Sequence, residues 1–300
     1  MEKIGETMTA ISNTLQVTRA PLPIALRIRR LIENVLLYAF LLAISAFMLI
    51  PFIWMLSTSL KPPDEIFTKP PVLLSPHANL DSYAFLLQNG ILRNVANSFI
   101  IALGATLLSL FFCSLGGYGF AKFRFPGKGV MFAFLLGTMI VPFTIIMAPL
   151  FVMMRDFKWI DTFWPLIIPG AANAFGIFFM RQYISTVTSE LLDAARIDGA
   201  GEFAIYWRVI LPIIAPGLVS LGMIFFMSAW NNYLWPLIIL KSPENFTLPL
   251  LIRSTIGPAG RTIWNVQMAA SVISIIPLLV IFLVFQRRFV EGITAGAVKS

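Results

Sequence analysis

Six long stretches of this 300-residue chain contain no Asp, Glu, Lys, Arg or His. A helix needs about 20 predominantly apolar residues to cross the hydrocarbon core of a bilayer, and charged side chains are costly there. We therefore predict an all-α integral membrane protein with six transmembrane helices. They are expected at Val35–Leu56, Ser98–Ala121, Gly129–Met154, Phe163–Met180, Val209–Leu234 and Val266–Phe285.

The composition agrees with this class and excludes several others. Charged residues make up 12% of the chain, about half the ~25% that is typical of soluble domains. One cysteine, Cys113, and one histidine, His77, exclude a disulfide framework and a zinc site, so we expect no metal and no cofactor. We expect His77 to be a solvated loop residue. The net charge of +8 is spread between the apolar runs, so we expect no nucleic acid partner.

The distribution of positive charge predicts the orientation in the membrane. If the N-terminus is cytoplasmic, 14 of the 22 Lys and Arg residues lie on the cytoplasmic side and 8 on the other side. Cytoplasmic loops carry the excess of Lys and Arg, so both termini are expected inside. The first apolar run exceeds the roughly 7–15 residues of a signal-peptide core, and we expect it to be retained as a helix.

The longest external connection, 57–97, is rich in proline and contains Lys61-Pro62-Pro63 and Lys69-Pro70-Pro71. Proline removes a backbone donor and restricts the residue before it. We therefore predict an ordered or semi-rigid loop here rather than a helix.

The longest cytoplasmic connection, 181–208, has the pattern of two short helices joined by a sharp turn. Ser189 is a suitable N-cap, and Glu190 in the first turn opposes the positive end of the helix dipole. Gly199 supplies the stop because it tolerates positive φ. A second helix should begin at Gly201 or Glu202. Its spacing predicts one shared face for Phe203, Tyr206, Trp207 and Ile210.

This connection resembles the EAA loop of binding-protein-dependent ABC importers, whose pattern is EAA, three residues, Gly, nine residues, Ile, one residue, Leu-Pro. At that spacing this chain has Asp193-Ala194-Ala195, Gly199, Val209, Leu211 and Pro212. Asp193 replaces Glu, and Val209 replaces Ile. The C-terminal segment 286–299 is similar to the ending of the carbohydrate-uptake branch, the maltose-type permeases, and the modest outer loop resembles the smaller permease of such pairs.

The resemblance covers about 35–300 and implies a type I ABC importer permease bundle with a cytoplasmic EAA coupling loop. It implies a second permease subunit, two cytoplasmic ABC ATPase subunits and an extracytoplasmic solute-binding protein as partners, in a bacterial or archaeal plasma membrane. The expected divisions are a cytoplasmic segment 1–34, a first helix with its external loop 35–93, the transmembrane domain 94–286 and a cytoplasmic tail 287–300.

Two sets of site residues follow as expectations. The resemblance implies ATPase docking through Glu190, Asp193, Ala194, Ala195, Asp198, Gly199, Phe203, Leu211 and Pro212. The alternatives are a solvated acidic face for the three carboxylates and an anchor at the bilayer interface for Phe203 and Trp207. Amides and an aromatic ring that could contact a sugar are Asn173, Trp230, Asn231 and Asn232. Interhelical hydrogen bonds are the alternative for these amides.

Two absences from the sequence favour a transport subunit driven by a partner over an enzyme. No G-x-x-x-x-G-K-[ST] motif for nucleotide phosphates occurs, and no apolar run carries an ionisable relay of the kind ion-coupled carriers use. The expected function is therefore sugar import, with ATP hydrolysed by other subunits. Alternatives are an ABC permease for a non-sugar solute, an ion-coupled transporter, and a membrane enzyme acting on lipid-linked sugars.

Overall fold

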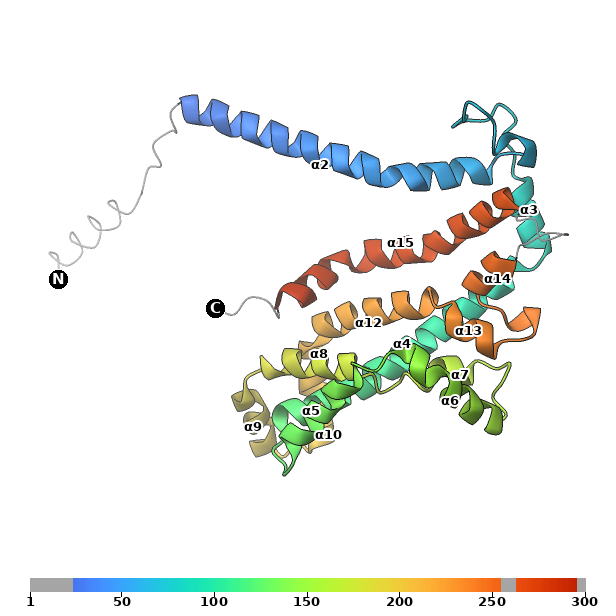
Figure 1. The fold of residues 1–300 in the computed structure, drawn as a ribbon. Helices are drawn as coiled ribbons and strands as arrows, with labels where there is room; N and C mark the ends of the chain where they lie inside the picture. The colour runs from blue at the N-terminus through green and yellow to red at the C-terminus, as the bar shows by residue number, and fades with distance from the viewer. Residues whose placement is uncertain (1–23, 255–262, 296–300) are drawn as a thin grey trace. The chain divides into compact units, whose positions relative to one another are not determined.

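The computed structural model describes residues 24–254 and 263–295, which contain helices and connecting loops and no strand. The α-helices of four or more residues are α2 Ile24–Ser59, α3 Asp81–Gln88, α4 Ile91–Lys122, α5 Lys128–Thr138, α6 Phe143–Asp156, α7 Trp164–Ile167, α8 Ala174–Ser185, α9 Ser189–Ile197, α10 Glu202–Ile205, α12 Ala215–Trp230, α13 Leu234–Ile239, α14 Leu248–Ser254 and α15 Trp264–Ala295 (Figure 1). The all-α prediction is confirmed for this part of the chain.

The chain divides into two compact units, 1–54 and 55–300. The first contains most of α2, whose side chains are exposed from 28 to 54. Residues 35–56 of this 36-residue helix carry no charged side chain and are suited to lie in hydrocarbon. The expected division at 34/35 falls inside α2, the one at 93/94 inside α4 and the one at 286/287 inside α15.

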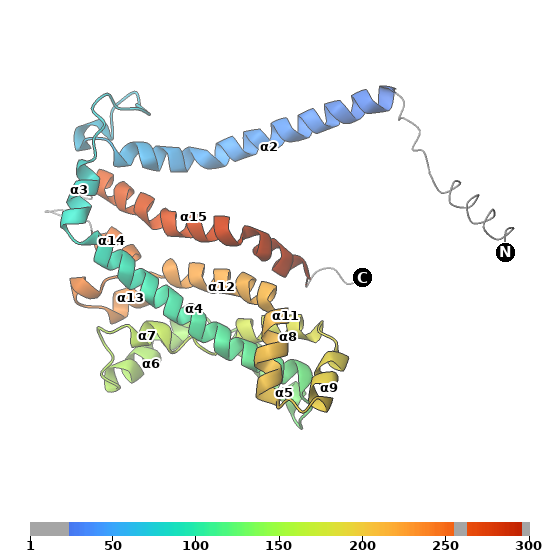
Figure 2. The same cartoon turned by 180° about the vertical axis from the view of Figure 1, so that it is seen from behind.

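The second unit is a bundle in which α4 packs against α8 and α12, and α12 packs against α15 (Figure 2). The crossing of α4 and α8 is close because both helices carry glycine there. A Cβ at Gly117 would lie 2.6 Å from the Cβ of Met180, and one at Gly176 would lie 2.6 Å from the sulfur of Cys113. Small residues allow such approach between membrane helices, where van der Waals packing drives association.

Three of the six predicted spans are interrupted rather than continuous in the structure. The third consists of α5 and α6, bent by 94° across 139–142. The fourth consists of α7 and α8, separated by residues 168–173. The fifth begins at Ala215 rather than Val209, after a bend of 78°, and it ends at Trp230.

Proline and glycine cause these breaks. Pro142 is the N-cap of α6, and Pro169 and Gly170 lie between α7 and α8. Proline lacks a backbone N–H and clashes with the preceding turn, whereas an average of hydropathy registers neither effect. Among the residues that the structure describes, three helices, α2, α4 and α15, are long and apolar enough to cross a membrane, and the number rises to five if each of two bent pairs is one span.

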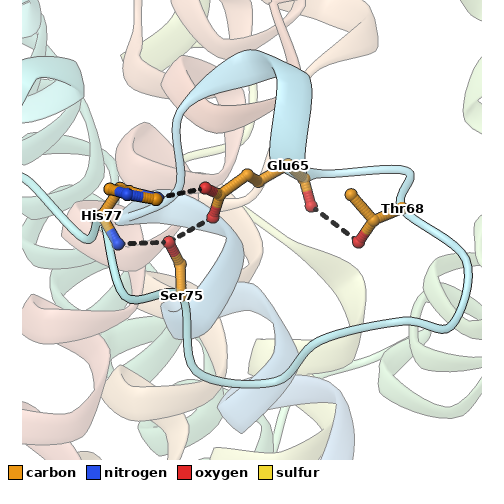
Figure 3. Close-up of polar contacts among 4 residues, drawn as sticks. All are labelled: Glu65, Thr68, Ser75 and His77. Atoms are coloured by element: carbon orange, nitrogen blue, oxygen red, sulfur yellow. Dashed lines mark hydrogen bonds and ion pairs between the residues drawn. The ribbon is translucent and has the colours of Figure 1, made fainter.

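The predicted non-helical external loop is right for 66–80 and wrong for 81–97, which holds α3 and the start of α4. The proline-rich part is fastened by Glu65, which accepts hydrogen bonds from the Ser75 hydroxyl and from the His77 ring at 2.6 Å (Figure 3). These two hydrogen bonds hold the pKa of the Glu65 carboxyl below its ordinary value. His77 is exposed, as expected, but it also joins the two ends of this loop.

Candidate functional site

The first candidate site is the 188–213 segment, which contains α9 and α10. The predicted helix, turn and helix are present: α9 ends at Ile197, Gly199 has φ +81°, and α10 begins at Glu202. The Ala200 N–H donates to Ala195 O at 3.0 Å and closes the turn. The predicted N-cap is wrong by one position, because Thr188 has the extended N-cap conformation and Ser189 already lies in the helix.

The second half of the segment departs from the predicted helical face. A π-helical turn occupies Tyr206–Ile210 and is followed by the short helix α11, Leu211–Ile213. Tyr206 and Ile210 are buried, whereas Phe203 and Trp207 are exposed. The predicted closeness of the rings is nevertheless confirmed in part, because the Tyr206 ring centroid lies 6.4 Å from that of Phe203 and 5.4 Å from that of Trp207.

Buried side chains anchor the 188–213 segment to the bundle. Leu192 of α9 and Ile205 of α10 are almost completely buried in the cluster that includes Met180 of α8. The Tyr206 and Ser114 hydroxyls are 2.7 Å apart, which joins the segment to α4. The Lys122 ammonium, at the end of α4, donates to Val187 O. Any displacement of the segment therefore acts on α4 and α8 directly.

Arg196 pairs with Asp193 within α9 and joins α9 to α10 through Glu202. Its guanidinium donates to Asp193 at 2.7 Å and to Glu202 at 2.7 Å, and the Tyr118 hydroxyl of α4 donates to the other Glu202 oxygen at 2.9 Å. Ion pairs on a surface contribute little individually, but this one continues to a buried tyrosine. Sequence analysis did not find Arg196, Glu202 or Tyr118, because their proximity depends on the turn.

The outer surface of the segment carries most of the predicted docking residues. Glu190, Asp193, Ala194, Asp198, Gly199, Phe203 and Pro212 are exposed, whereas Ala195 and Leu211 are partly packed against the core. Ile197 is 86% exposed and Phe203 66% exposed. Figures 1 and 2 show α9 and α10 together at one end of the bundle. Exposed large apolar residues on a rooted segment are typical of a surface that binds another protein.

The second candidate site is a hollow of about 600 Å³ where three helix breaks meet. Its lining includes Met139 and Val141 from 139–142, Gly170 and Asn173 from 168–173, and Asn232 from the break after α12. We call it the break cavity. A smaller adjoining hollow of about 150 Å³ shares Gly170, Asn173 and Asn232 and adds Ser109. Non-helical backbone at membrane depth is tolerated where it is buried in protein or lines a water-filled cavity.

The two amides of the break cavity use their oxygens locally. Asn173 is the N-cap of α8 and accepts from the Gly176 N–H at 3.1 Å, and Asn232 accepts from the Trp235 N–H at 3.4 Å. Within the described ranges, no hydrogen bond is formed by either side-chain NH₂ group. Both residues line the cavity, so their NH₂ groups are donors available to a polar occupant.

The structure separates the other two predicted contact residues from this pair. The Trp230 ring is 1% exposed, stacks on Phe226 and donates its N–H to Ser274 O at 3.2 Å. The Asn231 amide donates to Met227 O at 2.9 Å. Neither residue lines the break cavity or the smaller hollow. Trp235, which the sequence did not single out, lines the cavity and donates its ring N–H to Pro165 O at 2.9 Å.

A carboxylate clamp closes the loops beside the break cavity. Asp161, between α6 and α7, has φ +61° and accepts hydrogen bonds from the Lys241 and Ser242 N–H groups at 2.9 and 3.1 Å and from the Ser242 hydroxyl. Partial burial alone would raise the pKa of Asp161, but these hydrogen bonds, with one from Asn245, lower it to about 2. The clamp fixes the α6–α7 loop to the chain that follows α13.

Comparison with protein families identifies the group to which the sequence belongs. Residues 113–295, from the middle of α4 to the end of α15, match the family model described as the binding-protein-dependent transport system inner membrane component. The chain belongs to this family. The stretch includes the 188–213 segment and every break of the cavity, so both candidate sites lie in the part that this permease shares with its family.

Individual relatives can be aligned with this permease over most of its length. It is 36% identical over 278 residues to the arabinooligosaccharides transport system permease protein AraQ of Bacillus subtilis, covering 90% of this chain and 97% of that one. It is 34% identical to the lactose transport system permease protein LacG of Rhizobium radiobacter, covering 91% and 98%. A solved structure of a bacterial ABC transporter involved in the import of the acidic polysaccharide alginate matches with a TM-score of 0.74, 27% identity and coverage of 90% and 99%. The resemblance drawn from the sequence is thereby confirmed.

Proposed function

We propose that this permease forms half of the translocation pathway of an ATP-driven, binding-protein-dependent sugar importer. Family membership and relatives named for arabinooligosaccharides and lactose support this class. ATP is hydrolysed by separate subunits, since the family is the membrane component of such systems. The names of the relatives also include the acidic polysaccharide alginate, so the family alone leaves the solute open.

The proposed complex contains a second permease subunit, two cytoplasmic ATPase subunits and an extracytoplasmic solute-binding protein. Six spans are counted by treating α5 with α6, and α7 with α8, as broken spans beside α2, α4, α12 and α15. The excess of Lys and Arg supports cytoplasmic termini. In that orientation the 188–213 segment lies in the cytoplasm and the Asp161 clamp outside.

The 188–213 segment is proposed as the EAA loop that receives the ATPase. The single observation that carries this assignment is that Ile197 and Phe203 project from a segment whose neighbouring residues, Leu192 and Ile205, are fully buried. The exposed apolar residues can bind a partner. Because the buried residues hold the segment against the bundle, a movement of the partner can be transmitted to the bundle. Arg196 and Gly199 fix the angle between α9 and α10.

The break cavity is proposed as this permease's share of the solute pathway. Helix breaks expose backbone groups that water or solute can satisfy, and interrupted helices form the solute sites of several transporter classes. We place Asn173 and Asn232 in that pathway because both line the cavity. Trp230 and Asn231 are left out because they do not line it.

Reconstitution in sealed vesicles tests the proposal. The permease, its partner permease, the ATPase subunits and the solute-binding protein should together accumulate labelled sugar when ATP is supplied on the ATPase side. Omitting the ATPase should abolish uptake, with or without an imposed proton or sodium gradient. Uptake that persists without the ATPase in the presence of such a gradient would instead establish the ion-coupled alternative.

A further inference from the structure

The break cavity has no charged wall. Its described lining consists of apolar residues together with one threonine and two asparagines, and the smaller hollow adds two serines. No Asp, Glu, Lys, Arg or His occurs among these lining residues. A solute that passes here meets hydrogen-bonding groups and apolar surface but no fixed charge from this permease.

A neutral wall discriminates between solutes by their charge. An ion that leaves water loses hydration, and this loss is offset only by an opposite charge or by several hydrogen bonds directed at the ion. A carboxylate or phosphate would find the NH₂ groups of Asn173 and Asn232 but no Lys or Arg. An uncharged hydroxyl group loses much less on entry and is matched by a single amide donor.

The remaining lining suits a sugar ring. Phe143 and Phe175, which are 43% and 37% exposed, line the cavity beside the two amides. A saccharide has hydroxyls at its edges and C–H groups on its ring faces, so amide donors can contact the edges and aromatic side chains the faces. The contacts are weak and few, which lets the solute leave as readily as it enters.

From this arrangement we infer that the permease carries uncharged saccharides and rejects anionic ones, and that the NH₂ groups of Asn173 and Asn232 donate to the passing hydroxyls. The inference rests on the proposed function and adds the charge class of its solute. It makes Asn173 and Asn232 specificity residues. Their oxygens keep a separate task, because they bind backbone N–H groups at the start of α8 and α13.

That division of tasks allows a clean substitution. Asn173→Asp and Asn232→Asp keep the oxygen that accepts from Gly176 or Trp235, and Asp is as good an N-cap as Asn. Both variants lose the NH₂ donors and place a negative charge in the neutral wall. Asn89→Asp is the matched control, because the Asn89 amide is exposed, donates to Phe85 O and lies outside both hollows.

The full complex is assayed in vesicles with arabinotriose and lactose as uncharged probes and digalacturonate as the anionic probe, after each has been tested for binding to the solute-binding protein. We expect ATP-dependent uptake of an uncharged probe, a fall of about tenfold or more in Asn173→Asp and Asn232→Asp, and a change below twofold in Asn89→Asp. Co-purification of the ATPase with each variant verifies assembly. Where an Asp variant assembles poorly, Asn173→Ser or Asn232→Ser, which retains an oxygen acceptor and replaces the NH₂ group by a single hydroxyl donor without adding charge, is used and should show a smaller loss in the same direction.

The possible contradictions are distinct. Rapid uptake of digalacturonate by the unaltered complex, or unchanged uptake of the uncharged probes in both Asp variants, would overturn the inference while the proposed function stands. A complex that hydrolyses ATP but accumulates none of the probes that its binding protein binds would overturn both.

Discussion

At the 188–213 segment the charged side chains lie on the surface and pair with one another, and large apolar side chains project beside them. At the break cavity the lining carries no charge, and the Asp161 carboxylate, which is not among the lining residues, holds the α6–α7 loop to the chain after α13. The first arrangement suits a lasting contact, since exposed apolar area stabilises association and ion pairs fix geometry. The second suits passage, since no strong interaction retains a solute.

The difference indicates that coupling to the ATPase and selection of the solute depend on separate parts of the chain. The 188–213 segment is rigid because buried residues and a left-handed turn determine its shape. The break cavity is hollow because three helices stop at the same place. Damage to the first should therefore uncouple or disassemble the transporter, whereas damage to the second should alter which solute moves and leave assembly unchanged.

The largest effect is expected at Gly199, whose φ of +81° is unfavourable for any residue with a Cβ and most unfavourable for a β-branched one. Gly199→Val should lower co-purification of the ATPase and ATP-driven uptake more than thirtyfold, because it shifts α9 relative to α10. Gly199→Asn should retain most activity, since Asn tolerates this conformation.

Gly201 provides the control for this change. It lies two residues away, with open space around its Cα and φ −69°, in the N-cap conformation of α10. Gly201→Ser should be harmless because Ser is a favoured N-cap, whereas Gly199→Ser should be defective. Equal behaviour of the two serine variants would show that backbone conformation at Gly199 does not shape the docking surface.

The next largest effect is expected at the apolar surface of the segment. Ile197→Ser and Phe203→Ser should each weaken ATPase binding about tenfold or more, the usual size for a central interface residue. Neither should lower the thermal stability of the isolated permease, since both side chains are exposed. Ile205→Ala, by contrast, should destabilise the fold by about 2–5 kcal/mol because Ile205 is fully buried. Detergent-solubilised melting curves and ATPase titrations distinguish the two kinds of loss.

The 188–213 segment was largely predictable from the sequence because its signals are local. Gly199, the start of α10 at Glu202 and the acidic first turn all depend on neighbours within a few residues. The prediction missed the π-helical turn at Tyr206–Ile210, where the Tyr206 ring is buried and Trp207 is 45% exposed with its ring stacked on Phe111 of α4. That turn depends on packing against Ser114 and Tyr118 of α4, which no local pattern reveals.

The break cavity was only partly predictable. Asn173 and Asn232 could be selected as polar residues in apolar runs, but Trp230 and Asn231 looked equally suitable. Which of them faces the hollow depends on where α12 ends and on how α7 and α13 lie beside it. Proline marks where a span can bend, but the sequence does not say which prolines break the helix: Pro142 and Pro169 lie at breaks, whereas Pro149 and Pro277 lie inside helices.

A moderate effect is expected at Arg196, which ties α9 to α10 and, through Glu202, to Tyr118. Arg196→Gln should raise the number of ATP molecules hydrolysed per sugar imported about two- to fivefold, while the ATPase still binds, because the two helices can then move separately. Arg155→Gln is the control, since Arg155 pairs with the adjacent Asp156. A normal coupling ratio in Arg196→Gln would mean that buried residues alone transmit the motion.

The smallest effect is expected at Asp161, whose carboxylate does not line the break cavity but holds together two of the loops beside it. The pKa of about 2 lies below the ordinary value of 3.8, so the carboxylate stabilises the clamp fully above about pH 4 and loses this contribution as the pH falls toward 2. Amide hydrogen exchange at Lys241 and Ser242 should accelerate over that interval once the intrinsic pH dependence is subtracted. In Asp161→Asn, exchange should already be several-fold faster at neutral pH, with a smaller further change on acidification and uptake reduced less than threefold. If amide hydrogen exchange at Lys241 and Ser242 is as slow in the variant as in the unaltered protein, backbone packing alone holds these loops. The Asp161 charge would then not be required to keep the loops beside the break cavity in place.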